Sequence, residues 1–596
     1  MLSPDARAVA IDVLRPPAGY RLDRTVLTTY SLDLEVLLAL PLAVLAHADG
    51  GVERLLEDPL LLLEAMREAG ERVQVFVDEA GIAIPRTSRA LYASLEPSVH
   101  PVRAPNGGAF HPKVWIARFL MPGQPPLLRV AVASRNLTFD RSWDVALVSE
   151  ATTGGKRPIA ETRPLGQLVR ALPGLSTRGI DPLLESALTD LAGELENTRF
   201  PAPKDFNECV TFHGFGLAAG RQTPWKPLPQ ATRILAIAPF ASRTALDALK
   251  DTGASETTLV SRSEALDELS EGVLDSWSEV LALSDMATDE PDDETASRPS
   301  GLHAKLIGIE YGYKVTWFVG SANLTAAAFT GQNVEMMAAI TGPKGIPGGK
   351  TGFGIDRFRE SGFLNLCEPY RRTEPPERDA ALQRAQQALE EAKNRLVASE
   401  LKVVCRPKED TWEWVLEGAI TLPADVKVSM WPVSVSEDLA RDLELPSVWS
   451  LPTSRLTAFA AFRLHVEADV SDVRLALKLP VEGMPEGRIN QVLRTLIDSP
   501  ERFLQFMRAL LGGFDGLMDW AAGTGSGAGS WGAGFDRETL LEDLVRTASR
   551  EPARLDPIRR LVKDLRATAD GREIIPDDLH AIWQVVDAAA RKGGGK

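Results

Sequence analysis

Two sets of side chains suited to handling a phosphate group occur in the chain, in two segments of similar pattern. They are His111, Lys113 and Asn136 in the first segment, and His303, Lys305 and Asn323 in the second. In each, His and Lys take alternating positions of an apolar stretch that we expect to be a strand, so both side chains point to one face. A second apolar stretch follows and ends in Ser-x-Asn-Leu-Thr. Such agreement of order, spacing and residue type is hard to reach by chance.

These residue types are sufficient for phosphodiester cleavage. A neutral imidazole can attack phosphorus while a second, protonated imidazole donates to the leaving oxygen. The lysines and asparagines supply donors for the non-bridging oxygens, where negative charge builds up in the transition state. The reaction would pass through a phosphohistidine and end with attack by water or an alcohol. No cluster with metal-ligand spacing occurs near the motifs, so we expect no metal and no other cofactor.

His-x-Lys followed by Ser-x-Asn, twice in one chain, resembles the phospholipase D superfamily of phosphodiesterases. The resemblance covers roughly residues 20 to 370. It implies an α/β fold in which two repeats, each a mixed sheet flanked by helices, meet across a pseudo-twofold axis and form one active site. By motif position, the implied catalytic residues are His111, Lys113, Asn136, His303, Lys305 and Asn323, with Ser134 and Ser321 as phosphate-binding or supporting residues.

Two further positions of the family pattern are informative. The family often has an acid after the Asn that orients a histidine; Glu335 in NVEMM fits as a catalytic residue, and Asp144 in SWDVAL as a supporting one. The family usually has Asp five residues beyond the Lys, where this chain has Glu310 in the second half, an implied phosphate-binding or supporting residue, and Arg118 in the first. Loss of that Asp is common in nuclease-like and tyrosyl-DNA phosphodiesterase-like members, so the resemblance still implies an enzyme.

The elements that must position these residues also repeat. Alternating and β-branched stretches predict strands, and periodic apolar stretches predict helices. In the first half the order is strand 25–30, helix 32–46 and strand 72–77; in the second half it is strand 233–240, helix 242–249 and strand 257–261. Each half then continues into its His-x-Lys and Ser-x-Asn segments. An acidic, Pro/Ser-rich stretch at 286–300 predicts a loop before the second His motif.

The remaining third of the chain differs in pattern. A polar Ala/Gln/Glu/Arg-rich helix precedes short β segments at regular spacing, and amphipathic helices follow, with a Gly-rich linker at 521–534. The expected domains are 1–200 and 201–373 as first and second repeats, 374–400 as a connecting helix, 401–484 as a β-sandwich-like domain and 485–596 as a helical region.

Composition limits the setting. The chain has 596 residues, 44% hydrophobic and 25% charged, which is typical of packed globular domains. The 66 basic and 82 acidic residues give a net charge of −16, which repels a polyanion at long range. Three scattered cysteines favour a reducing compartment. With neither a signal peptide nor a membrane span evident, we expect a cytoplasmic protein without stable membrane insertion.

The substrate is the open question. The first candidate is a nucleic acid, DNA before RNA. Two segments, TTYSLDLEVLLALPL and RINQVLRTLIDSPERFLQFMRALL, also resemble bacterial phospholipase D-like proteins associated with helicases and phage defence, which implies a helicase or ATPase partner that presents the strand. The second is a phospholipid, cleaved by a hydrolase or phosphatidyl transferase. The third is a non-catalytic phosphate-binding scaffold, supported by Arg118. Both motif sets lie in one chain, so a monomer suffices for chemistry and a dimer remains open.

Overall fold

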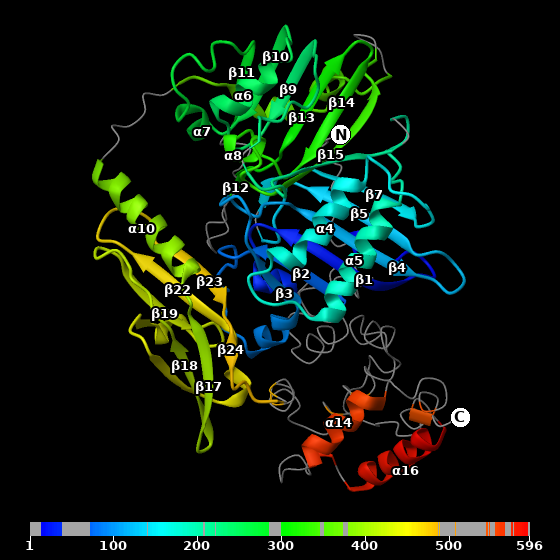
Figure 1. The fold of residues 1–596 in the computed structure, drawn as a ribbon, viewed down its shortest axis with the longest axis vertical. Helices are drawn as coiled ribbons and strands as arrows, with labels where there is room; N and C mark the ends of the chain where they lie inside the picture. The colour runs from blue at the N-terminus through cyan, green and yellow to red at the C-terminus, as the bar shows by residue number, and fades with distance from the viewer. Residues whose placement is uncertain are drawn as a thin grey trace, which may run out of the picture.

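The structure is a computed structural model. It describes residues 13–38, 72–139, 141–206, 209–220, 222–284, 300–345, 351–372, 380–486, 555–566, 574–575 and 577–593, with isolated positions between 488 and 548. Figure 1 shows two sheet-based units stacked one on the other, a β module beside the first, and the C-terminal helices α14 (Leu555–Arg566) and α16 (Asp577–Gly593) at the opposite end from the second unit. The predicted 286–300 loop (except Ser300), the 521–534 linker and most of helix 32–46 lie outside the described residues.

The first unit is a mixed sheet of six strands in the order β3-β2-β1-β4-β5-β7. β1 runs parallel to β2, and β2 to β3, whereas β4, β5 and β7 continue the sheet antiparallel. Their bounds are β1 (Arg21–Thr29), β2 (Val73–Asp78), β3 (Val99–Val102), β4 (Val114–Leu120), β5 (Leu127–Ala133) and β7 (Ala146–Thr152). A 3-10 helix, η2 (Ala90–Ser98), leads into β3.

The second unit is a sheet of eight strands in the order β16-β11-β10-β9-β13-β14-β15-β8. The bounds are β8 (Thr211–Phe215), β9 (Arg233–Ile237), β10 (Glu256–Ser261), β11 (Glu279–Leu283), β13 (Leu306–Tyr311), β14 (Lys314–Gly320), β15 (Glu335–Pro343) and β16 (Cys367–Pro369). From β11 to β15, six strands repeat the order and the parallel-then-antiparallel pattern of the first sheet. The internal repeat predicted from the sequence is therefore confirmed at the level of strand order.

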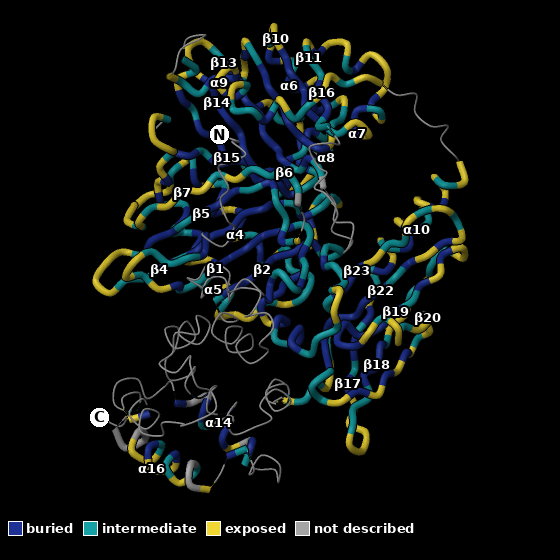
Figure 2. Tube along the Cα trace, turned by 180° about the vertical axis from the view of Figure 1, so that it is seen from behind, coloured by how far each residue is buried: buried dark blue, intermediate teal, exposed yellow. Residues whose placement is uncertain are grey.

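Apolar side chains join the two sheets. One core contains residues of both, such as Val26 and Trp317, together with Leu168 and Leu188 from the helices α4 (Arg163–Leu175) and α5 (Pro182–Glu196). A separate core covers the other face of the second sheet and holds the short helices α6 (Arg243–Lys250), α7 (Ser263–Asp267) and α8 (Ala326–Phe329). Figure 2 shows the strands as the most deeply buried segments of both units. α9 (Ile355–Arg359) and η4 (Phe363–Leu366) complete the second unit.

The two His-x-Lys segments do not lie inside strands, and this part of the prediction is wrong. β4 begins at Val114 and β13 at Leu306, directly after the motif lysines. The reason is that each segment pairs with the other repeat. Phe110 forms a bridge with Val334, and the short strand β12 (Ser300–Leu302) runs parallel to β6 (Arg141–Trp143). Each motif is thus held between its own sheet and the opposite repeat.

The β module consists of two four-stranded sheets, β21-β18-β17-β24 and β20-β19-β22-β23. The bounds are β17 (Lys402–Lys408), β18 (Thr411–Glu417), β19 (Lys427–Pro432), β20 (Arg441–Asp442), β21 (Ser447–Leu451), β22 (Phe459–His465), β23 (Val473–Lys478) and β24 (Val481–Glu482), with η5 (Glu437–Leu439) and η6 (Thr453–Arg455) between strands. Helix α10 (Ala380–Ala398) precedes the module and buries one stripe, Ala385, Leu389, Ala392 and Leu396. That stripe, the module's core and the outer face of the first sheet share one apolar cluster.

Candidate active site

The two histidines of the motifs are each bonded to an acid from the other repeat. His111 Nδ1 lies 2.9 Å from Glu335 Oε2, and His303 Nδ1 lies 2.9 Å from Asp144 Oδ1. Backbone pairing between the repeats brings them together: His111 N donates to Val334 O, and His303 N donates to Trp143 O, each the residue before the acid. With Nδ1 engaged, each ring has Nε2 for chemistry.

The serines of the Ser-x-Asn motifs bind the same carboxylates. Ser134 Oγ donates to Asp144 Oδ1 at 2.7 Å, and Ser321 Oγ donates to Glu335 Oε2. Each hydroxyl also accepts the backbone N–H of the residue after the acid, Val145 in the first repeat and Met336 in the second. The serines therefore contact the same carboxylates that hold the histidines.

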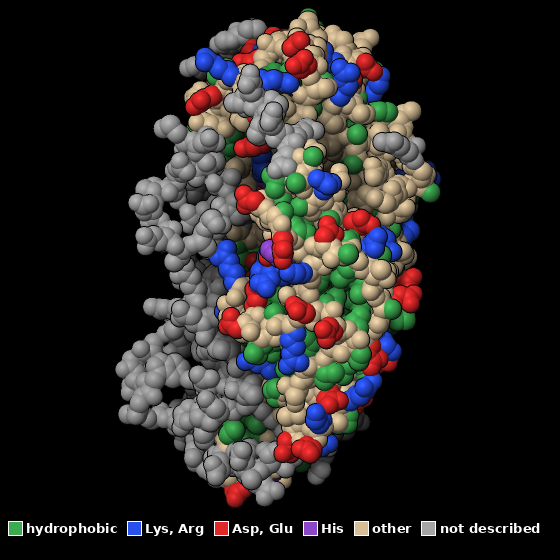
Figure 3. Space-filling model, turned by 90° about the vertical axis from the view of Figure 1, so that its left-hand side faces the viewer, with side chains coloured by type: hydrophobic (Ala, Val, Ile, Leu, Met, Phe, Trp, Pro, Cys, Tyr) green, Lys and Arg blue, Asp and Glu red, His purple; other side chains and the backbone are tan. Residues whose placement is uncertain are grey.

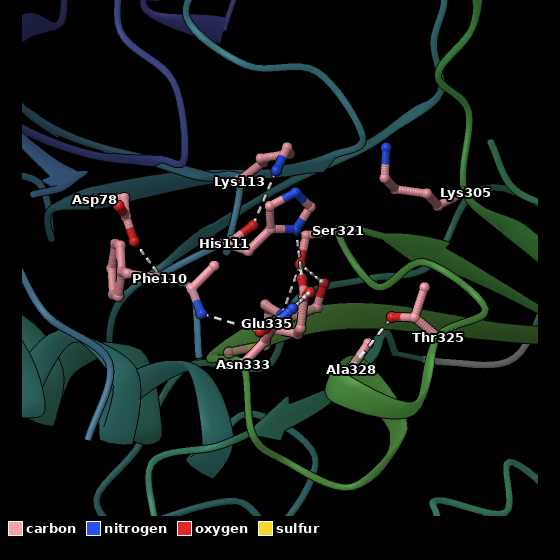
Figure 4. A network of polar contacts seen from close by, with 12 residues as sticks. Asp78, Phe110, His111, Lys113, Lys305, Ser321, Thr325, Ala328, Asn333 and Glu335 are labelled. Atoms are coloured by element: carbon pink, nitrogen blue, oxygen red, sulfur yellow. Dashed lines mark hydrogen bonds and ion pairs between the residues drawn. The ribbon is translucent and has the colours of Figure 1, made fainter. Parts of the chain in front are cut away.

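The two lysines are almost fully buried. Lys113 is 0% exposed and Lys305 is 1% exposed, and each donates to the backbone carbonyl of its own motif histidine, at 3.0 Å and 2.7 Å. Figure 4 shows the side chains of Lys113, His111 and Lys305 around a common centre, above Ser321 and Glu335. Burial, and then the charge of Lys305, holds the pKa of Lys113 well below its ordinary value. The two ammonium groups therefore repel each other, and an anion bound between them would relieve that repulsion.

The asparagines lie at the ends of β5 and β14. Asn136 Oδ1 accepts from Ser31 N at 3.3 Å and from the Thr29 hydroxyl at 3.5 Å, so the amide oxygen is engaged and the NH2 group is the side offered to a ligand. Asn323 has a buried Oδ1 for which no hydrogen-bond partner is found in the described part of the chain. Buried polar atoms without a hydrogen-bond partner are rare in proteins. Where one occurs, a bound ligand or ion can supply the missing partner.

Glu310 and Arg118 occupy the place of the family's Asp, far along their strands from the histidines. Glu310 Oε1 accepts from Ile355 N at 2.7 Å at the start of α9, and its other oxygen lies 3.7 Å from Arg233. Arg118 reverses the charge: it pairs with Asp23 at 2.6 Å and with Glu194 of α5 at 2.8 Å. Both residues connect a strand to neighbouring elements, so any support from Glu310 acts through the fold and not through phosphate contact.

Three residues that were not predicted from the sequence also position the site. Asn333 accepts from Ala109 N at 3.0 Å and donates to Glu335 Oε1 at 3.3 Å, so it fixes the acid and the approach to His111 together. Asp78, at the end of β2, accepts from Phe110 N at 2.8 Å (Figure 4). Arg262, directly after β10, donates to Leu302 O from Nε at 2.9 Å and Nη2 at 2.6 Å.

A signal for Asp78 and Arg262 was present in the sequence. Both follow directly on predicted strands that the structure shows to be parallel, and ligands of α/β sheets bind outside the carboxyl ends of such strands. Tyr30 follows β1 in the same way, and its ring lies 5.2 Å from the His111 ring. Asn333 gave no comparable signal, because it acts only after the two repeats have met.

The protonation states favour neutral histidines beside ionised acids. Burial lowers the pKa of His111 to about 4, against the opposing pull of Glu335, and burial also lowers the pKa of His303. Burial alone would raise the pKa values of Asp144 and Glu335, but their hydrogen bonds and charge interactions with the histidines hold both below their ordinary values. Each neutral imidazole then donates Nδ1–H to a carboxylate and keeps the Nε2 lone pair.

No group of three or more His, Cys, Asp or Glu side chains that could hold a metal ion occurs among the residues that the structure describes. The same part of the chain contains no helix both long and apolar enough to cross a membrane.

Comparisons with known proteins give matches among solved structures. No family model matches the chain, and no curated protein matches it. Similar solved structures include yeast tyrosyl-DNA phosphodiesterase, with 11% identity and a TM-score of 0.32, over 53% of this chain and 82% of that one. Two single-residue variants of the yeast protein give TM-scores of 0.34 and 0.31, identities of 11% and 12%, and coverages of 56% and 53% of this chain and 86% and 82% of theirs.

These structural neighbours are phosphodiesterases.

Proposed function

We propose that this chain is a phosphodiesterase of the phospholipase D type that cleaves a nucleic acid through a phosphohistidine intermediate. DNA is the first candidate substrate, before RNA. The two repeats would be related by a pseudo-twofold axis and share one active site. The observation that carries the proposal is the crossed pairing of His111 with Glu335 and of His303 with Asp144. Neither repeat alone supplies an oriented histidine. A reaction that needs both a nucleophile and a general acid uses both oriented histidines.

His111 is the proposed nucleophile. It is the more buried of the two, with 12% of its side chain exposed against 18% for His303, and its pKa of about 4 keeps it neutral. Its Nε2 forms a bond to phosphorus while the phosphorus–oxygen bond to the leaving group breaks. His303, protonated at Nε2, gives its proton to that oxygen.

In the second step the roles of the histidines reverse. His303, now neutral, takes a proton from water, the water oxygen bonds to phosphorus, and the bond from phosphorus to His111 breaks. The ammonium groups of Lys113 and Lys305 donate to the non-bridging oxygens and stabilise the charge of both transition states. Asn136 and Asn323 supply amide donors to the same oxygens.

We also propose that a helicase or ATPase partner delivers the substrate strand. A chain with a net charge of −16 attracts a polyanion weakly, so a helicase or ATPase that delivers the strand would compensate. The regional resemblance to phage-defence proteins supports that setting.

The first experiment compares substrates. Purified protein is incubated with single- and double-stranded DNA, RNA and phosphatidylcholine vesicles, each with and without EDTA. Cleavage of DNA that survives EDTA supports the proposal, and loss with EDTA contradicts a metal-independent reaction. Release of a lipid headgroup would favour the phospholipase reading, and no turnover on any substrate would favour the scaffold. His465→Ala is the control for the two motif histidines, because that ring is 47% exposed and bound to Asp472 in the β module.

A second experiment assigns the nucleophile. Thymidine 5′-(p-nitrophenyl phosphate) has a leaving group that needs no proton, so His303→Ala should still release nitrophenolate once and retain a nucleotide on the protein. His111→Ala should retain none. Intact-mass spectrometry detects the adduct, and peptide mapping should place it on His111. An adduct on His303 in the His111→Ala chain would reverse the assignment.

A further inference from the structure

The strand register makes the two repeats comparable residue by residue. Val26 on β1 and Leu235 on β9 are equivalent, since each lies opposite the third residue after the motif lysine. Val26 pairs with Gln74 on β2, and Leu235 pairs with Thr258 on β10. Asp78 and Arg262 lie four residues after these partners. Both bind the backbone of the residue before the motif histidine, but with opposite polarity: the carboxylate accepts an N–H, and the guanidinium donates to a carbonyl. One structural task is thus done by an acid in the first repeat and by a base in the second.

The difference extends along the carboxyl edges of the two sheets. Asp33 and Ser242 are equivalent because the N–H of each donates to the leucine carbonyl after the motif Asn, Leu137 at 2.8 Å and Leu324 at 2.7 Å. The equivalent positions are Asp33, Glu35, Asp78 and Glu79 in the first repeat, which we term the acidic edge, and Ser242, Thr244, Arg262 and Ser263 in the second, which we term the neutral edge.

Neighbouring charges reduce this contrast without removing it. Arg103 pairs with Glu79, and Arg86 lies near Asp33 on the acidic edge. On the neutral edge the exposed Glu264 faces Arg262, and the exposed Arg243 adds a further positive charge. A polyanion is therefore repelled at the acidic edge and accepted at the neutral one. The face in Figure 3 mixes charges of both signs at short intervals.

The neutral edge also carries an aromatic ring on which a nucleobase can stack. Phe240, which follows β9, is 47% exposed, and the guanidinium carbon of Arg262 lies 5.4 Å from its ring centroid. The two bonds to Leu302 O use Nε and Nη2 of Arg262, so the third nitrogen, Nη1, is not spent on them. An aromatic face beside an anchored guanidinium is suited to one nucleotide, with its base on the ring and its phosphate on the cation.

We propose that Phe240 and Arg262 form a nucleotide-binding subsite on the His303 side of the active site, so that the substrate strand lies over the neutral edge and avoids the acidic one. This inference rests on the proposed function, since it names where its substrate binds. It also relieves the conflict between an acidic protein and a nucleic-acid substrate: only one edge has to accept the strand.

The test measures binding without turnover. Full-length protein carrying His111→Ala is titrated against a fluorescein-labelled single-stranded DNA of about 12 nucleotides, the span of one to three binding sites. Adding Phe240→Ala should weaken binding roughly 5- to 150-fold, the effect of losing one stacked base. Adding Arg262→Gln should weaken binding and lower the slope of log Kd against log salt by about 0.7, the loss of one phosphate contact.

Two controls separate the subsite from general effects. Tyr313→Ala removes a more exposed aromatic, 90% accessible, at the β13–β14 turn, and should change Kd less than about twofold. Glu35→Gln removes a charge from the acidic edge, where no strand is expected to lie, and should also change Kd little. Turnover of bis(p-nitrophenyl) phosphate by the unaltered chain is measured in parallel, because this diester carries no nucleobase and so reports the chemistry separately from base stacking.

The outcomes are distinct. No binding by the parent chain, a Phe240→Ala effect below twofold, or tighter binding in Glu35→Gln that exceeds the loss in Phe240→Ala would overturn the subsite. If the unaltered chain cleaves no diester while the binding results hold, the subsite stands and the proposed catalysis fails. If the diester is cleaved and Phe240→Ala binds normally, the catalysis stands and the subsite fails.

Discussion

Glu335 and Asp144 each serve a histidine that lies more than 150 positions away in the chain. Glu335→Gln keeps the shape of the side chain but removes the charge that favours Nδ1–H on His111. We expect kcat/KM on a phosphodiester to fall roughly 10²- to 10⁴-fold, the range expected when a proton-transfer pair loses its orientation. The effect is measured by initial rates on a chromogenic diester.

Asn333→Ala is the graded companion of that variant. It removes the 3.3 Å bond to the other oxygen of Glu335 and the 3.0 Å bond from Ala109 N but leaves the carboxylate itself in place, so its loss of rate should be smaller. Equal rates for Glu335→Gln and the unaltered protein would contradict the role of the carboxylate.

The two imidazoles also set the expected pH dependence. His111 must be neutral to attack, so kcat/KM should rise as the pH rises through its pKa of about 4. His303 must be protonated to serve the leaving group, so kcat/KM should fall as the pH rises through its pKa, which lies below the ordinary 6.5. An acidic optimum results. A bound phosphate raises the pKa of His303, so the falling limb of kcat should lie at higher pH than that of kcat/KM.

A pH–rate profile with a leaving group of low pKa supplies the control. It needs no proton from His303, so the falling limb should disappear. A limb that persists unchanged would show that another group, Lys113 among them, is titrating.

The motif residues could be predicted from the sequence because their types and spacing carry the chemistry directly. His111, Lys113 and Asn136 and their counterparts were named on those grounds, and the structure brings the two sets to a common region. Asn333 could not be predicted, since its contacts with Ala109 and Glu335 exist only once distant segments have met.

Strands were predicted well where a residue pairs within its own sheet, and poorly where it pairs across the repeats. The expected strand at 72–77 is β2, and the stretch at 257–261 is β10. The error lay at the His-x-Lys segments, which are apolar and alternating but pair with β6 and Val334 of the opposite repeats. Periodicity reports which side chains are buried and is silent on the identity of the partner strand.

Arg118 joins β4 to α5 and to β1, five residues along the strand from Lys113, a separation of about 16 Å at 3.3 Å per residue. Arg118→Met should therefore lower the free energy of unfolding by about 1 kcal/mol, the scale for a partly exposed ion-pair network. Its kcat/KM should stay within twofold of the unaltered protein.

Urea unfolding and diester turnover measure the two quantities. A large loss of turnover with unchanged stability would mean that Arg118 acts at the site, contrary to its contacts. Glu310, like Arg118, lies five residues beyond its motif lysine, so strand geometry carries it away from that lysine in space.

The β module is fastened to the first repeat by a buried ion pair. Glu96 of η2 and Arg488, which follows β24, are both 9% exposed and meet at 2.8 Å, and Glu96 also accepts from Ala458 N at 2.8 Å. Removing one partner leaves a buried charge, so Arg488→Ala should lower the free energy of unfolding by about 3–5 kcal/mol.

The double variant Glu96→Leu with Arg488→Met is the matched control. It removes both charges and keeps the volume, so most of the lost stability should return. Limited proteolysis between repeat and module reports the same docking independently. If the single and double variants are equally unstable, the charges are not what fastens the module.

The arrangement of the modules could not be predicted from the sequence. Composition and segment spacing indicated a β unit after a polar helix, and such a unit is present with α10 packed beside it. Which face of the first sheet receives it depends on shape and on pairs such as Glu96 with Arg488, which are separated by 392 positions.

The crossed acid–histidine pairs make activity conditional on assembly. During synthesis the first repeat emerges with His111 but without Glu335, which is more than 200 residues further along the chain. Until the second repeat has folded and docked, each imidazole lacks its carboxylate, and the nucleophile and the acid do not face each other. Under the proposed function, a nascent or truncated chain would thus be harmless to the nucleic acids around the ribosome, and the cutting activity would begin only when the fold is complete.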